Sequence, residues 1–154
     1  MKVRLERVKI PVLVTLLSVC SSALAVPRLG DPLPPNPWKD PPTRALVVLY
    51  SHDCGDLKDT WKVLLNQKMS LEVVNPEDTP AAAPPGLSVW RGSAATAFSR
   101  ALKIRHYPTV LYLEDGRINR FWEGDKNDPK MGTSLLKFLS SLPVGDNQES
   151  AIGN

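Results

Sequence analysis

The apolar residues in the central part of the chain fall into short continuous runs. Such runs predict strands buried on both faces of a sheet, because a strand with one exposed face alternates with polar residues. The first two runs are Arg44–Tyr50 and Leu71–Val74. Two more, Val110–Leu113 and Ile118–Trp122, flank Asp115-Gly116, a dipeptide typical of a β-hairpin turn.

Three other segments carry apolar residues every three or four positions, which predicts amphipathic helices. The first, from about Cys54 to Met69, has Asp53 as its expected N-cap. The second runs from its expected cap Ser93 to Ile104, with an apolar face of Ala94, Ala97, Phe98, Ala101 and Leu102. The third begins at Asp128-Pro129, as N-cap and first helical residue, and its inner face holds Met131, Leu135, Phe138, Leu139 and Leu142.

These elements follow the order β-α-β-α-β-β-α, which predicts an α/β fold over residues 44–142. Two strands joined through a helix imply a right-handed parallel pair, and the hairpin adds an antiparallel pair. We therefore expect a four-stranded mixed sheet with helices on its faces.

The segments around this domain differ from it in composition. Residues 26–43 are dense in proline and predict an extended leader, with Trp38 as the one residue suited to dock on the domain. Residues 76–92 are rich in proline and alanine and predict a long loop, which is usually functional or mobile. The polar segment 143–154 is predicted to be disordered.

The first 25 residues have the pattern of a secretory signal peptide. An apolar run, Ile10–Val19, is followed by an A-x-A cleavage site at 23–25 and preceded by the basic residues Lys2, Arg4, Arg7 and Lys9. The run is shorter than the ~20 residues of a membrane span. We therefore expect a periplasmic or extracellular protein without a span after cleavage. Lipoprotein anchoring through Cys20 is the weaker alternative, because Val19 stands where a lipobox has a small residue.

Cleavage would change the charge of the chain. The full sequence has 19 Lys and Arg against 16 Asp and Glu, and the signal holds four of the basic residues and one acidic residue, so 15 of each remain. A chain without net charge gives no indication of a nucleic-acid or anionic-membrane partner.

Cleavage would also remove Cys20 and leave Cys54 as the single cysteine. One thiol cannot form an internal disulfide, so Cys54 is either a reactive or mixed-disulfide thiol or a small buried apolar residue. Its polar neighbours argue against burial; they are His52, Asp53, Gly55 and Asp56. At the head of a helix, unpaired N–H groups and the helix dipole would favour the thiolate.

The chain resembles the thioredoxin family in a set of short motifs that occur in the same order. They are the strand Ala45–Tyr50, Cys54-Gly55-x-x-Lys58, Tyr107-Pro108-Thr109, Asp115-Gly116 and Gly124. The resemblance spans residues 44–142 and implies a thioredoxin-like fold. It also implies that Pro108 is a cis proline beside Cys54 and that Tyr107, with Thr109 next to the proline, belongs to a site for an extended peptide.

Three positions depart from the family's pattern. Leu57 stands where the second cysteine of a C-x-x-C motif would be, Asp53 replaces the preceding tryptophan, and Val48 aligns with a buried acidic residue. Without a resolving thiol the chain cannot close an internal disulfide. Any exchange would pass through a mixed disulfide that an outside thiol resolves.

Two functions remain open at this point. In the first, the chain is an exported monothiol exchange protein acting on a protein or a low-molecular-weight thiol or disulfide, with Cys54 as nucleophile and His52 as a modulator of its pKa. Asp53 and Asp56 would oppose a thiolate. In the second, the same groove holds a protein partner in the cell envelope without redox turnover.

A metal site has less support than either function. Cys54, His52, His106 and an aspartate have suitable ligand types, but no recognised ligand spacing supports such a site. We therefore expect neither a metal nor a cofactor. His106 fits the end of a helix as well as it fits a site beside Pro108.

Overall fold

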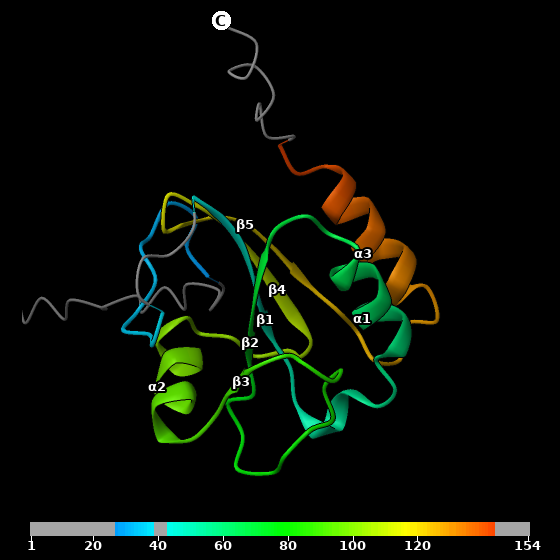
Figure 1. Ribbon diagram of the computed structural model, residues 1–154, viewed down its shortest axis with the longest axis horizontal. Coiled ribbons are helices and arrows are strands. Elements are labelled where there is room, and N and C mark those ends of the chain that lie inside the picture. The colour runs from blue at the N-terminus through cyan, green and yellow to red at the C-terminus, as the bar shows by residue number, and fades with distance from the viewer. Residues whose placement is uncertain (1–26, 39–42, 144–154) are drawn as a thin grey trace, which may run out of the picture.

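The computed structural model describes residues 27–38 and 43–143. The expected signal peptide, with Cys20, and the expected tail beyond Pro143 lie outside these ranges. Within them, a five-stranded mixed sheet is flanked by three α-helices (Figure 1). None of the helices in the described ranges has the length and apolar character needed to cross a membrane.

The strand order in the sheet is β3-β2-β1-β4-β5. The strands are β1 Arg44–Leu49, β2 Ser70–Val74, β3 Val89–Trp90, β4 Thr109–Glu114 and β5 Arg117–Glu123. β1 and β2 are parallel, as predicted, and β4 and β5 form the predicted antiparallel hairpin. Its turn residues Asp115 and Gly116 have φ values of 51° and 72°, the left-handed conformation that this turn requires.

The predicted count of four strands is wrong by one. β3 lies inside the segment predicted to be a loop and pairs with β2 in parallel. It also receives a hydrogen bond from the backbone N–H of Asn75, whose nitrogen lies 2.9 Å from the Trp90 oxygen. Two residues are too few to produce a recognisable apolar pattern, so the sequence gives no signal for this strand.

The helices are shorter than predicted, and the predicted caps are wrong. They are α1 Lys58–Leu65, α2 Ser93–Ala101 and α3 Met131–Ser140. Leu57, Gly92 and Lys130 occupy the cap positions in place of Asp53, Ser93 and Asp128. Carboxylates still accept backbone N–H groups near the starts of α1 and α3: Asp56 accepts the Lys58 N–H at 2.9 Å, and Asp128 accepts the Lys130 N–H at 2.8 Å.

The buried face of α2 also differs from the prediction. Ala95, Phe98 and Ser99 face the sheet, whereas Ala94, Ala97 and Ala101 are exposed. Alanine occurs on both faces of surface helices, so its spacing indicates an orientation only weakly. Phe98 and Leu102, the two large residues of the predicted face, are buried as predicted.

The two faces of the sheet are covered by different elements. α1 and α3 lie together on one face, and α2 covers the other (Figure 1). The leader residues 27–38 contact β5: the Gly30 N–H donates to the Ile118 carbonyl at 2.7 Å, and Pro32 forms a β-bridge with Arg117. Trp38 docks on the domain, as predicted, with its ring 5.5 Å from that of Trp90.

Candidate functional site

Cys54 lies in a short turn between β1 and α1. The turn is a 3-10 helix over His52–Cys54, and the Cys54 N–H donates to the Ser51 carbonyl at 3.2 Å. Gly55 follows with a φ of 71°, a conformation that favours glycine, and α1 begins only at Lys58. The thiol is therefore not at the head of an α-helix, and the predicted support of a thiolate by the helix dipole is wrong.

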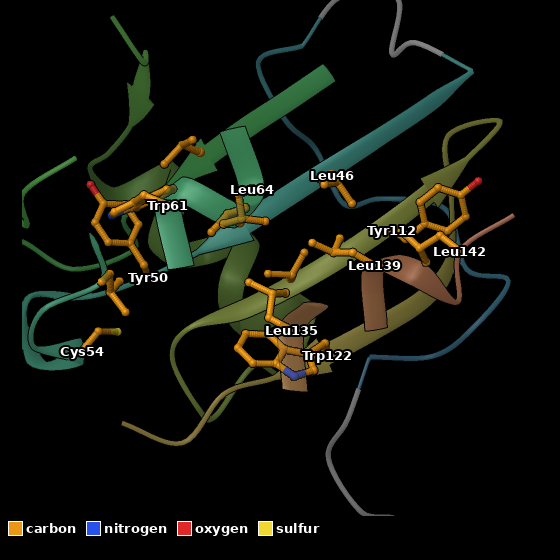
Figure 2. Packing of buried hydrophobic residues seen from close by; sticks show 14 of the residues in the cluster. Leu46, Tyr50, Cys54, Trp61, Leu64, Tyr112, Trp122, Leu135, Leu139 and Leu142 are labelled. Atoms are coloured by element: carbon orange, nitrogen blue, oxygen red, sulfur yellow. The ribbon is translucent and has the colours of Figure 1, made fainter. Parts of the chain in front are cut away.

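The prediction that Cys54 is exposed is also wrong. Its exposed fraction is 4%, whereas His52, Asp53 and Gly55 are exposed. In a 3-10 helix residues three positions apart lie above one another, so Ser51 and Cys54 both turn inward while the polar residues between them face solvent. Figure 2 shows Cys54 at one end of the hydrophobic cluster under α1 and α3, on the side of Tyr50.

The surroundings of the thiol favour its neutral form. Burial is the largest influence and raises the pKa of Cys54. Ser51 lowers this pKa through its backbone N–H, 3.4 Å from Sγ, and through its hydroxyl, 3.7 Å from Sγ. The charge of Glu77 raises it and that of Lys126 lowers it. The net effect is a raised pKa, so Cys54 is a thiol at neutral pH.

His52 is bound to two carboxylates and not to the thiol. Its Nδ1 lies 2.7 Å from Oε2 of Glu77, and its Nε2 lies 3.2 Å from Oδ1 of Asp53. Within the described part of the chain, His52 makes no hydrogen bond to Cys54. His52 therefore makes no direct contact through which it could lower the pKa of the Cys54 thiol, as the sequence had suggested.

Glu77 is a site residue that the sequence did not indicate. It is positioned by Asn75, which is fully buried at the end of β2: the Asn75 side chain accepts the Glu77 N–H at 3.0 Å and donates to the Thr79 carbonyl at 3.0 Å. An Asn-Pro pair at the end of a strand is a signal for such a side-chain-stabilised turn. This pair predicts the turn, but it does not predict that the turn places the Glu77 side chain beside His52.

The candidate metal ligands Cys54, His52 and His106 are not brought together as a set. One ligand atom each from His52, Asp53 and Glu77 lies within 4.8 Å of the others, and neither Cys54 nor His106 belongs to this group. Both ring nitrogens of His52 already face a carboxylate. The group therefore satisfies its own polar atoms by internal pairing.

The segment Tyr107-Pro108-Thr109 connects α2 to β4. The Tyr107–Pro108 peptide bond is cis, as the resemblance predicted, and Pro108 accepts a hydrogen bond from the Gly124 N–H at 2.8 Å. The Tyr107 hydroxyl lies 2.7 Å from the Ser99 hydroxyl. The Thr109 hydroxyl is buried and donates to the His106 carbonyl at 2.6 Å, so this side chain is engaged within the protein.

The backbone of Tyr107 differs from that of its neighbours. Within residues 27–38 and 43–143, neither its N–H nor its carbonyl forms a hydrogen bond. Tyr107 is half-buried and packs against the cluster that contains Cys54. Burial raises the pKa of Tyr107, Ser99 lowers it, and the charges of Glu77 and an ionised Cys54 raise it. Tyr107 also packs against the second buried cluster, the one under α2.

No protein-family model, curated protein or solved structure matches the chain. The site is therefore assigned from the geometry of the chain itself.

Proposed function

We propose that this protein is an exported, thioredoxin-like binding module without redox turnover. In this proposal the segment around Tyr107 and Pro108 binds an extended stretch of a partner protein in the cell envelope. The mixed sheet with β1 at its centre, with helices on both faces, supports a fold of this class. Export rests on the signal-peptide pattern of residues 1–25.

The observation that carries the proposal is the burial of Cys54. A cysteine that attacks disulfides needs both access to its partner and a substantial thiolate fraction. Cys54 is 4% exposed, and burial raises its pKa. Among the described residues it is the only cysteine, so no second thiol lies beside it to resolve a mixed disulfide.

Peptide binding is supported by the backbone of Tyr107. An N–H and a carbonyl without partners are the groups through which an extended peptide adds to a protein by strand-like pairing. The groups around them are held by the protein itself: Ser99 binds the Tyr107 phenol, and the Gly124 N–H donates to the Pro108 carbonyl. A backbone that is fixed before binding loses less entropy when the partner arrives.

Monothiol exchange is the second candidate, and the contacts of Ser51 favour it. Its N–H and hydroxyl both lie near Sγ and would stabilise a thiolate once one forms. The thiolate would attack one sulfur of a partner's disulfide, form a mixed disulfide and release the other sulfur as a thiolate. An external thiol, of a protein or a small molecule, would then displace Cys54.

Site-specific photo-cross-linking separates the two candidates. A photoreactive amino acid would replace His106, an exposed neighbour of Tyr107, in cells that express the full chain, with exposed Lys68 as the control position. The proposal predicts a cross-linked partner from position 106 and none from 68, with the same yield in Cys54→Ala. Loss of the adduct in Cys54→Ala would instead favour exchange.

A further inference from the structure

A groove of about 780 Å³ lies between α1 and the loop Pro80–Pro84. Its walls include Ser51, His52 and Gly55, which flank Cys54 in the chain, but neither Cys54 nor Tyr107. The volume falls within the range of about 300–1,000 Å³ that is usual for small-molecule sites.

The floor of the groove is made of two aromatic side chains that are fixed in place. The rings of Tyr50 and Trp61 meet edge to face, with 5.1 Å between centroids and 86° between planes. Both residues are buried in the main cluster, where Figure 2 shows them side by side. A ligand in the groove would therefore rest on an apolar surface that needs no rearrangement.

The loop wall is held against this floor. The Tyr50 hydroxyl donates to the Ala81 carbonyl at 3.0 Å, and the Arg91 guanidinium donates to the same oxygen at 3.3 Å. The wall has the sequence Pro-Ala-Ala-Ala-Pro. Its prolines lack an N–H, and the Ala81 carbonyl is already engaged, so the wall suits a hydrocarbon better than a peptide strand.

The opposite wall, α1, adds positive charge and one exposed apolar residue. Lys58 and Lys62 line the groove one helical turn apart. Asp56 also lines the groove and lies 3.7 Å from Nζ of Lys58, whereas Lys62 has no ion pair within the described ranges. Leu65, also on the wall, is 50% exposed. The loop wall carries no charged side chain.

We propose that this groove binds a single acidic amphiphile, such as a medium-chain carboxylate. The hydrocarbon part lies over Trp61 and against Leu65 and the Pro80–Pro84 wall. The carboxylate pairs with Lys62, which has no ion pair among residues 27–38 and 43–143. This binding uses neither the Tyr107 backbone nor the Cys54 thiol, since neither residue lines the groove.

The test is a titration of the full chain with dodecanoate below its micelle concentration, followed by tryptophan fluorescence. The proposal predicts saturable binding of one molecule per chain, and a signal that Trp61→Phe removes. Lys62→Glu is expected to weaken binding roughly three- to tenfold, because it removes one exposed ion pair with the ligand carboxylate and adds one repulsion. Leu65→Glu is expected to weaken it at least as much.

Matched controls separate the groove from general surface effects. Leu136 is 48% exposed on α3, and Lys68 is exposed beyond the end of α1; neither lines the groove. Leu136→Glu and Lys68→Glu should bind dodecanoate like the unmodified chain. Equal weakening by the controls would overturn the proposal, as would a signal that persists in Trp61→Phe or the absence of saturable binding.

The sign of the charge and the nature of the occupant are tested separately. Dodecyltrimethylammonium has the same chain with a cationic head, and binding as tight as that of dodecanoate would overturn the proposal. So would a concentration-dependent dimer that Leu65→Glu dissociates, because a second copy of the chain would then be the occupant of the groove.

Discussion

The two faces of the sheet are built from the same strands but bury different kinds of side chain. Alternate residues of β1 point to opposite faces, so Leu46, Val48 and Tyr50 join the cluster under α1 and α3, whereas Ala45, Val47 and Leu49 join the cluster under α2. The α2 face is closed by Trp38 of the leader, whose ring lies 5.7 Å from that of Phe98.

The difference lies in the ionisable groups. The buried cluster under α1 and α3 includes Tyr50 and Cys54, whose pKa values are raised mainly by burial. The described residues of the buried cluster under α2 include no ionisable side chain. Among the described residues, the thiol therefore lies under α1 and α3, whereas Tyr107 packs against both clusters.

Phe98→Ala tests the packing face and should have the largest effect. Removing a fully buried aromatic ring leaves a cavity and is expected to cost about 3–5 kcal/mol of unfolding free energy. Urea denaturation followed by circular dichroism measures it. A cost below about 1 kcal/mol would mean that the α2 face is not a packed core.

Gly124→Ala tests the site face at the point where the hairpin meets Pro108. A Cβ at this position would lie 2.7 Å from the Trp122 ring and 3.0 Å from Pro108 Cγ, which requires these groups to shift. Overpacking of this kind is expected to cost about 1–3 kcal/mol. The same urea denaturation measures the change.

Gly132→Ala is the matched control. Apart from its chain neighbours and the backbone of its own helix, α3, no atom lies within 4 Å of a Cβ built on Gly132. Because alanine has a higher helix propensity than glycine, this change should be neutral or stabilising by up to about 1 kcal/mol. Equal destabilisation by both substitutions would contradict the steric explanation for Gly124.

Trp38→Ala measures how much the leader contributes to the α2 face. Trp38 is half-buried against Trp90 and Phe98, so its loss should cost about 1–2 kcal/mol, less than that of a fully buried ring. Thermal unfolding measures this loss of stability, and the rate at which Cys54 is alkylated should not change. An unchanged melting temperature would mean that the leader does not stabilise the domain.

The smallest predicted effect is the pH dependence contributed by Cys54. Its pKa is raised in the folded chain above its ordinary value of 9.0, so the folded state holds the proton more tightly than the unfolded state. The stabilisation is complete below pH 9.0 and is lost as the pH rises toward the folded pKa. Cys54→Ala should reduce this alkaline loss in urea denaturation series, and an unchanged pH dependence would contradict the prediction.

The sequence predicts the main elements of the fold but not the state of the thiol. Continuous apolar runs predict β1, β2 and the β4–β5 hairpin, because each is long enough to show its pattern. β3 has two residues and shows none. The inward turn of Cys54 depends on the 3-10 geometry of His52–Cys54, and Glu77 reaches the site through a turn stabilised by Asn75. The order of polar and apolar residues predicts neither the inward turn of Cys54 nor the position of Glu77.

The central claim is that Cys54 is a buried, protonated thiol. The most direct test is its rate of alkylation by iodoacetamide as a function of pH, in the folded chain and in urea, followed by mass spectrometry of the peptide that contains Cys54. We predict a slower reaction in the folded chain and a midpoint above pH 9.0. A folded chain that reacts as fast as the unfolded chain, with a midpoint below pH 9.0, would contradict the claim.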